Sequence, residues 1–189
     1  VEVWDMQLIA RCAKITRTRR EFVRRLEKYA AESHLFLTDG SENLQIKYEG
    51  TTGDDEKEIK QNFSRRLKDC MEIDYKHGYT HCGPQTDDLV VMLDGTDVRK
   101  FGSQGQQRSC ALSLKLAEMK LYRDEQGEYP VLLLDDVFSE LDRARACRLA
   151  EAVAGFQTII TCTHLPPEII SALEKYSEFI VSGGKITKK

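Results

Sequence analysis

Apolar residues recur every seven positions along the first thirty residues of the chain. The recurring residues are Val1, Leu8, Ile15, Phe22 and Tyr29, with Cys12 and Leu26 between them. This spacing predicts a helix of roughly thirty residues with a coiled-coil-like apolar seam. Neither an N-cap residue nor an initiating Met precedes Val1, so we expect the chain to be a portion of a longer protein.

A second helix is predicted between about residues 56 and 73, where apolar residues recur every four positions. These residues are Ile59, Phe63, Leu67 and Met71. Neither helix can bury its apolar side alone, so we expect each to pair, either with the other or with sequence outside this chain. Between them, short runs at 35–37 and 44–48 flank the polar sequence Thr38-Asp39-Gly40-Ser41, which predicts a small β-hairpin.

The middle of the chain combines a long apolar helix with a short apolar strand. Two stripes of apolar residues predict that the helix is buried on more than one side. The stripes are formed by Cys110, Leu114, Ala117 and Leu121, and by Leu112, Leu116 and Met119. The strand at 131–134 is bounded by Pro130 and by two acidic residues. This layout is typical of a buried strand in a mostly parallel sheet.

Shorter elements complete the pattern and predict an α/β fold. They are a strand pair at 89–93 and 98–100, a helix between Asp142 and Gly155 with Cys147, Ala150, Val153 and Ala154 on its inner face, a strand at 157–161, a short helix at 168–175 and a hairpin at 178–188. We expect two parts, a helical arm at 1–80 and a head at 81–189.

Two places in this pattern carry chemistry. Residues 103–106 precede the long helix, and the free N–H groups and positive dipole of a helix start suit phosphate. Asp135 and Asp136 follow a strand, and open α/β sheets bind ligands at the carboxyl ends of their strands. One of these carboxylates can hold Mg²⁺, and the other can orient or deprotonate a water molecule.

Together these motifs resemble the C-terminal half of an ABC-type ATPase head of the SMC class, with its signature motif, Walker B motif and D-loop. Three segments resemble the RecF family of bacterial recombination mediators, namely FGSQGQQR at 101–108, ALSLKLAE at 111–118 and LLLDDVFSELD at 132–142. The similarity extends from about Trp4 onward. It implies the C-terminal lobe of such a head, a mostly parallel sheet flanked by helices, with an α-helical arm that carries a small β-hairpin.

The resemblance implies a role for each motif in the complete protein. Asp135 binds Mg²⁺ and Asp136 is the catalytic carboxylate. His164 resembles a switch residue that senses the γ-phosphate, although an ordinary polar loop residue fits the same position. The nucleotide-binding signature residues, which act across a dimer, are Ser103, Gln104, Gly105 and Gln106. The D-loop residues are Ser139, Glu140, Leu141 and Asp142.

The chain contains no Gly-x-x-x-x-Gly-Lys-Ser/Thr loop. We therefore expect a C-terminal portion without the Walker A region, which does not bind ATP fully and is inactive alone. For the complete protein the resemblance implies an ATPase that forms a homodimer through ATP. It also implies binding to DNA where duplex adjoins single-stranded gaps, and action with RecR and RecO to load RecA. Roles in DNA replication, repair, recombination and the SOS response, in the cytoplasm, follow from the same resemblance.

Composition adds a candidate DNA-binding face. The 189 residues are 41% hydrophobic and 31% charged, with a net charge of −3, which is ordinary for a globular protein. No apolar run approaches the ~18 residues of a membrane span, and the chain shows no signal-peptide layout. Residues 1–30 contain eight basic and four acidic residues, so a face with Arg17, Arg20 and Arg24 is a candidate for DNA binding. A solvated helix face explains the same pattern.

Cysteine usage points to a reducing compartment. The six cysteines are scattered, and several fall on apolar stripes, which indicates buried free thiols. Cys70, His77, His81 and Cys82 lie close together in the sequence, but their spacing matches no zinc pattern.

Two other functions fit the sequence, namely the head of a different SMC-class ATPase and a nonenzymatic module that binds DNA or a partner. Asp136, where most SMC-class heads carry Glu, and the compact arm both favour RecF. Gln85 and Thr86 replace a basic pair that is usual in the family, which puts in doubt any phosphate or DNA contact of that pair. When this chain is alone, we also expect exposed hydrophobic surface over the 131–134 strand and the Cys110 helix, with self-association or partial disorder.

Overall fold

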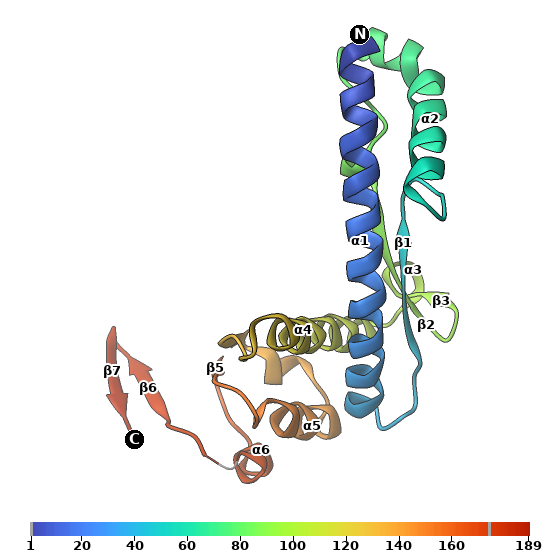
Figure 1. Ribbon diagram of the computed structural model, residues 1–189. Coiled ribbons are helices and arrows are strands. Elements are labelled where there is room, and N and C mark those ends of the chain that lie inside the picture. The colour runs from blue at the N-terminus through green and yellow to red at the C-terminus, as the bar shows by residue number, and fades with distance from the viewer. Residues whose placement is uncertain (1, 174) are drawn as a thin grey trace.

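The longest element of the fold is helix α1 (Glu2–Leu37). A second helix and a small sheet lie along it, and the later elements of the chain extend to one side of its C-terminal end (Figure 1). The computed structural model describes residues 2–173 and 175–189, apart from the side chains of Glu2 and Glu140. At 1.5 Å per residue, α1 is about 54 Å long. It lies beside α2 (Glu56–His77) in its first half and crosses α4 (Gln104–Gln126) near its end.

The predicted pairing of the two arm helices is confirmed. Cys12 of α1 packs with Phe63 and Leu67 of α2. Helix α2 begins where the Asp55 carboxylate accepts a hydrogen bond from the Glu58 amide at 2.7 Å. It ends at Gly78, whose left-handed backbone (φ 78°) terminates the helix.

The seven-residue seam predicted for α1 is only partly correct. Ile15 and Phe22 are 42% and 45% exposed, and Val1 lies outside the described residues. The buried residues of α1 are Cys12, Ala13, Thr16, Val23, Leu26, Ala30, Ser33, His34 and Leu37. The helix packs in turn against α2, a sheet and α4, and a straight helix drifts relative to a seven-residue repeat. The buried face therefore follows its partners rather than the repeat.

A three-stranded antiparallel sheet lies beside the middle of α1. Its order is β1 (Leu44–Glu49), β2 (Asp88–Leu93) and β3 (Thr96–Asp97). The hairpin predicted from 35–37 and 44–48 is wrong in its pairing, because residues 35–37 form the last turn of α1. Strand β1 instead pairs with β2, with Leu44 opposite Leu93. Leu44 and Ile46 are buried against α1, and this contact selects the register.

The second strand predicted after the Asp94-Gly95 turn is also wrong. Only Thr96–Asp97 pairs with β2, and Val98–Phe101 forms the short helix α3. The Asp97 carboxylate accepts hydrogen bonds from the amides of Arg99 (2.9 Å) and Lys100 (3.4 Å). This N-cap starts a helical turn at 98–101, where the sequence pattern predicts a strand.

A parallel pair of strands forms the centre of the head, β4 (Leu132–Asp135) and β5 (Thr158–Thr161). Helices α4, α5 (Arg143–Val153) and α6 (Pro167–Ala172) share a core with β4. The prediction of a fully buried strand holds for one face, since Leu132 is 2% exposed and Leu133 is 67% exposed. The expected exposed apolar surface is confirmed for the strands by Leu133 and by Ile159 of β5. It is wrong for the Cys110 helix, because Cys110, Ala117 and Leu121 are buried against α1 and the antiparallel sheet.

The chain ends in the predicted hairpin, β6 (Phe179–Ser182) and β7 (Lys185–Lys188). Gly183 and Gly184 both have positive φ (56° and 76°), as a two-residue hairpin turn requires. Figure 1 shows the hairpin apart from the helices. The helix predicted at 168–175 is α6, which begins and ends earlier; Glu174 lies outside the described residues. Within the described residues, no helix is both long enough and apolar enough to cross a membrane.

Candidate functional site

The turn at 103–106 is a capped helix start. Ser103 Oγ accepts a hydrogen bond from the Gln106 amide at 3.3 Å, and Gln106 Oε1 accepts one from the Ser103 amide at 2.9 Å. This reciprocal capping box holds the first turn of α4 in place. Helix geometry gives the amides of Gln104 and Gly105 no acceptor within the helix. The turn can therefore present N–H groups to an anion, as the sequence predicts.

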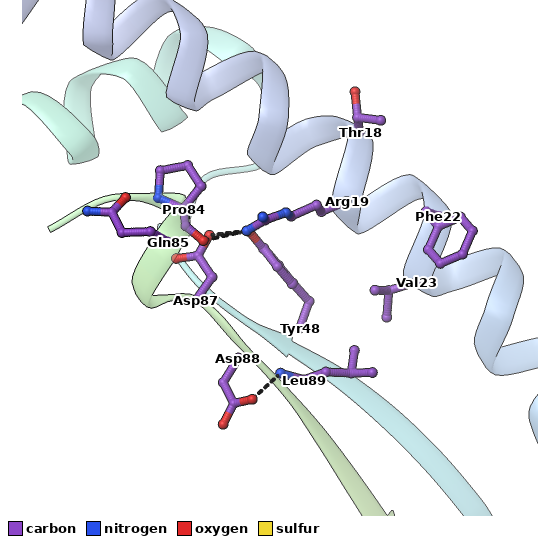
Figure 2. Close-up of a pocket in the computed structure, with 10 residues that line it drawn as sticks. All are labelled: Thr18, Arg19, Phe22, Val23, Tyr48, Pro84, Gln85, Asp87, Asp88 and Leu89. Carbon is purple, nitrogen blue, oxygen red and sulfur yellow. Dashed lines mark hydrogen bonds and ion pairs between the residues drawn. The ribbon is translucent and has the colours of Figure 1, made fainter. Parts of the chain in front are cut away.

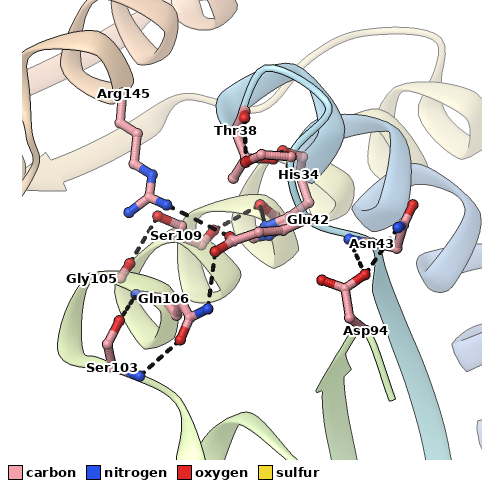
Figure 3. Close-up of polar contacts among 12 residues, drawn as sticks. His34, Thr38, Glu42, Asn43, Asp94, Ser103, Gly105, Gln106, Ser109 and Arg145 are labelled. Atoms are coloured by element: carbon pink, nitrogen blue, oxygen red, sulfur yellow. Dashed lines mark hydrogen bonds and ion pairs between the residues drawn. The ribbon is translucent and has the colours of Figure 1, made fainter. Parts of the chain in front are cut away.

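The Glu42 carboxylate, next to this turn, contacts side chains from three helices (Figure 3). Glu42 lies between α1 and β1, and its Oε1 accepts a hydrogen bond from Gln106 Nε2 at 3.0 Å. Its Oε2 lies 3.2 Å from His34 Nε2 in α1 and 3.6 Å from an Arg145 Nη atom in α5. Glu42 thus links the base of the arm, the start of α4 and the start of α5.

His34 is fully buried behind Glu42. Its Nδ1 lies 3.0 Å from Ser113 Oγ, and the Ser113 hydroxyl lies 2.7 Å from the carbonyl oxygen of Ser109, to which it can donate. Burial lowers the pKa of His34, while the neighbouring Glu42 carboxylate opposes that shift. The network is therefore a polar core that runs from α1 into α4.

The last D-loop residue begins the next helix. Asp142 caps α5 by accepting a hydrogen bond from the Arg145 amide at 3.0 Å, as predicted, and its Oδ2 lies 3.6 Å from Arg145 Nε. Arg145 also reaches the signature turn, because a Cβ at Gly105 would lie 3.3 Å from Arg145 Nη1. The structure therefore brings the signature and the D-loop together through Arg145 and Glu42. Leu141 packs on the head core, and the side chain of Glu140 lies outside the described residues.

Asp135 and Asp136 lie at the carboxyl ends of the parallel strands. The Thr161 hydroxyl from β5 contacts both residues, since it donates to the Asp135 carboxylate and lies 3.1 Å from the Asp136 amide. Asp136 has a left-handed backbone (φ 47°), and Ser139 Oγ lies 2.9 Å from its Oδ2. Both side chains are exposed. These oxygen donors suit a hard cation such as Mg²⁺, and the turn aims the Asp136 carboxylate away from the strand.

His164 lies in the exposed segment between β5 and α6, beyond the same strand ends. Among the described residues, no hydrogen bond or ion pair joins the 103–106 turn to Asp135 or Asp136. Within one copy of the chain, the two predicted halves of the site are therefore not joined by a direct polar contact between described residues.

The three candidate DNA-binding arginines differ in their surroundings. Arg20 donates to two carbonyls of the 51–53 loop and so fixes the connection to α2. Arg17 lies 3.6 Å from Glu56 across the helix pair. Arg24 is exposed on α1. Of the three, Arg20 has a structural task that the sequence did not indicate.

The cysteine and histidine cluster at the arm tip divides into two parts. His81 lies 2.7 Å from Asp74 and 3.0 Å from His77, whereas Cys82 packs in the arm core. Burial and the nearby Cys70 raise the pKa of Cys82 to about 12. Within residues 2–173 and 175–189, no group of three or more His, Cys, Asp or Glu side chains is arranged to hold a metal.

A cavity of about 470 Å³ lies beside α1, where β1, β2 and the 3₁₀ turn η1 (Pro84–Thr86) approach it (Figure 2). The nearly buried Asp87 side chain accepts a hydrogen bond from Tyr48 and lies 3.8 Å from Arg19. Gln85 lines the cavity, and its amide lies 3.3 Å from the carbonyls of Thr80 and Cys82. The sequence did not predict this cavity, because its walls come from separate segments.

Comparison with known proteins gives a consistent result, although no family model matches the chain. "DNA replication and repair protein RecF" of Halothermothrix orenii is 50% identical over 169 residues, which cover 86% of this chain and 45% of that protein. RecF of Lachnoclostridium phytofermentans is 41% identical over 186 residues, covering 98% and 50%. The chain spans about half the length of the curated relatives it matches.

Solved structures agree with the curated relatives. The recombination mediator protein RecF with ATP, of the RecFOR pathway, has a TM-score of 0.79 and 32% identity, covering 100% of this chain and 51% of that one. An SMC head bound to the C-winged helix domain of ScpA has a TM-score of 0.56 at 15% identity, covering 97% of this chain and 49% of that one, and shows a shared fold alone. The predicted ATPase-head fold and the resemblance to RecF are confirmed.

Proposed function

Because this chain is homologous to RecF along nearly its whole length, we propose that it supplies the signature motif, Walker B motif and D-loop of an ATP-hydrolysing head in a DNA replication and repair protein. The observation that carries this proposal is the carboxylate pair at the ends of two parallel strands. Asp135 and Asp136 are exposed there, and Ser139 approaches the Asp136 carboxylate. Such a pair can hold a cation and orient water at one point.

Each residue of the pair has a distinct task in this proposal. Asp135 would hold Mg²⁺ through its carboxylate, which the Thr161 hydroxyl orients. A bound Mg²⁺ would supply positive charge that offsets the charge of the phosphate groups. Asp136 orients the attacking water or accepts its proton. His164 faces the same strand ends as a sensor of the terminal phosphate.

The signature turn acts on a second copy of the chain. Ser103, Gly105 and Gln106 contact the terminal phosphate of ATP bound to the other subunit, with Gln104 in the same turn. This arrangement is supported by the lack of a direct polar contact between the turn and Asp135 or Asp136 among the described residues of one copy. ATP then joins two copies, and hydrolysis releases them. The D-loop residues Ser139 to Asp142 lie at this contact.

The wider role follows from the relatives. We propose that the complete protein binds DNA where duplex adjoins a gap, and acts in the cytoplasm with RecR and RecO to load RecA. The RecFOR pathway named for the solved relative supports this context. A different SMC-class head is less well supported, because the SMC head is 15% identical whereas the RecF relatives are 32–50% identical.

The test is ATP hydrolysis by this chain, alone and mixed with a segment that supplies a phosphate-binding loop, with DNA present. We expect no turnover alone, turnover on mixing, and loss of about a hundredfold or more in the Asp136→Asn mixture, as for removal of a general base. Turnover by the chain alone would mean that it contains an unrecognised phosphate-binding loop. Equal turnover with Asp136→Asn would refute the role of Asp136.

The arm is proposed to contribute to DNA binding through its basic face. Arg24 is the clean probe, because Arg20 also holds the 51–53 loop and its loss perturbs the arm. We expect Arg24→Glu to weaken DNA binding and to reduce its salt dependence. Unchanged affinity at low salt would exclude this residue. If Arg17→Glu and Arg24→Glu abolish function while Asp136→Asn does not, the nonenzymatic alternative is favoured.

A further inference from the structure

The Glu42 carboxylate lies where three elements meet, but its sequence context, a loop after a helix, gives it no motif. Its side chain is 15% exposed, and the residues around it come from α1, α4 and α5 (Figure 3). We infer that Glu42 is a positioning residue: it sets the Gln106 side chain in the signature turn and the Arg145 guanidinium beside the D-loop. This inference rests on the proposed function for its catalytic consequence, and on the contacts themselves for its structural one.

Gln106 is oriented at both ends of its amide. Its Oε1 accepts from the Ser103 amide, and its Nε2 donates to Glu42 Oε1 at 3.0 Å. Rotating the amide by half a turn would place a donor against a donor at Ser103 and an acceptor against a carboxylate at Glu42. The carboxylate therefore selects one orientation, and with it the geometry of the capping box.

Arg145 is held between Glu42 and Asp142 and lies against the signature glycine. Its Nη and Nε atoms lie 3.6 Å from Glu42 Oε2 and Asp142 Oδ2, respectively. A Cβ at Gly105 would lie 3.3 Å from Arg145 Nη1, so a side chain there would require the guanidinium to shift slightly. Without Glu42, the Arg145 guanidinium would keep, among the described residues, its ion pair with Asp142 alone. The connection between the D-loop and the signature turn would then be weaker.

The place of Glu42 in the chain also connects the signature turn to the arm. Glu42 belongs to the connection between α1 and β1, so it moves with the base of the arm. His34, one turn before the end of α1, contacts the same carboxylate. A shift of α1 therefore moves the Glu42 carboxylate, and with it the side chains of Gln106 and Arg145. No direct contact between the arm and a nucleotide is needed for this effect.

The test compares Glu42→Ala and Glu42→Gln with Glu32→Ala as the matched control. Glu32 is also at the end of α1 and lies 3.9 Å from Lys120 of α4, away from the signature turn. In this chain, hydrogen exchange of the Ser103 amide, followed by NMR, should accelerate about tenfold in Glu42→Ala, because its acceptor Gln106 is no longer held. Glu42→Gln should be intermediate, since its amide oxygen still accepts from Gln106.

In the mixture with the phosphate-loop segment, Glu42→Ala should lower kcat about tenfold while KM for ATP stays within about twofold. A merely structural role would lower the amount of active protein without this split between kcat and KM, and without partial rescue by Glu42→Gln. Ser103 exchange and kcat equal to those of Glu32→Ala would overturn the inference. If the wild-type mixture hydrolyses no ATP, the proposed function is refuted instead. The hydrogen exchange rate of the Ser103 amide then decides by itself whether Glu42 positions the turn.

Discussion

The signature turn and the strand ends, the two halves of the proposed site, are held in place by different means. At the signature turn, side chains position side chains: Glu42, Gln106, Arg145 and His34 form one polar network, largely shielded from solvent. At the strand ends, the backbone sets the turn that carries the carboxylates, and each carboxylate is contacted by a single hydroxyl, from Thr161 or Ser139. The Asp136 amide pairs with the Thr161 carbonyl at 3.0 Å, and a left-handed turn follows.

This difference indicates which half of the proposed site depends on a further partner. The polar network is internally satisfied, so this chain can build the signature turn itself. The strand ends rest on a two-stranded sheet whose outer face exposes Leu133 and Ile159. Covering that face would stabilise the carboxylate pair, whereas it would leave the signature turn unchanged.

The largest expected effect separates the two faces of β4. Leu132→Ala should lower the free energy of unfolding by about 2–5 kcal/mol, because it opens a cavity in the head core. Leu133→Ala, one residue away, should change it by less than about 0.5 kcal/mol. Urea titration of both variants measures this contrast. An equal loss in both would show that the outer face is already covered, for example by self-association.

A smaller effect is expected at the turn after β4. Asp136→Ala should cost about 1–2 kcal/mol, since alanine is disfavoured at φ 47° and the contact with Ser139 is lost. Asp136→Asn should be neutral within about 0.5 kcal/mol, because asparagine tolerates the left-handed region and keeps an acceptor. The same urea titrations apply. Equal stability of the two variants would mean that the backbone at 136 relaxes freely.

At the signature turn, the helix cap gives a comparable but local effect. Ser103→Ala should lower the free energy of unfolding by about 1 kcal/mol, the usual contribution of an N-cap serine. Gln104→Ala is the matched control, and its exposed position predicts a change within about 0.5 kcal/mol. If Ser103→Ala leaves the free energy of unfolding unchanged, the Glu42 network alone suffices to hold the turn.

Local patterns in the sequence predicted much of this architecture. The long helix after 103, the helix that starts at Asp142 and the final hairpin depend on residues close in the chain, and all are present in the structure. The pairing of β1 with β2 was missed, because alternation identifies a strand but not its partner. A turn at 38–41 offered a nearer candidate, yet packing of Leu44 and Ile46 on α1 decided the outcome.

The Glu42 network had only one weak sequence signal. Ser109 and Ser113, four residues apart, interrupt the apolar stripes of α4, and both are buried. Such a polar pair indicates that a polar partner packs there. Nothing local identifies that partner as His34, or connects His34 to Glu42 and Arg145. The carboxylates of the site were found from sequence because they follow a strand, whereas their supporting residues were not.

The smallest effect at neutral pH, and the most specific, concerns protonation of His34. A neutral imidazole can donate either to Ser113 or to Glu42, whereas an imidazolium donates to both. Burial nevertheless lowers the pKa of His34 below its ordinary value of about 6.5. Between the lowered pKa and about 6.5, the unfolded chain therefore binds more protons than the folded one. Stability due to this group is complete above about pH 6.5 and declines as the pH falls towards the folded pKa.

His34→Gln should remove this part of the pH dependence while keeping a side chain that can bond to Ser113 and Glu42. The measurement is the free energy of unfolding at pH 7.5 and pH 5.5, a range above the ordinary pKa of carboxyl groups. His164→Gln, at an exposed position, is the matched control and should retain the wild-type difference between the two pH values. If His34→Gln loses as much stability on acidification as wild type, another histidine is responsible. A smaller loss in His34→Gln alone would assign the acid sensitivity to the polar network, and so to the half of the site that this chain builds by itself.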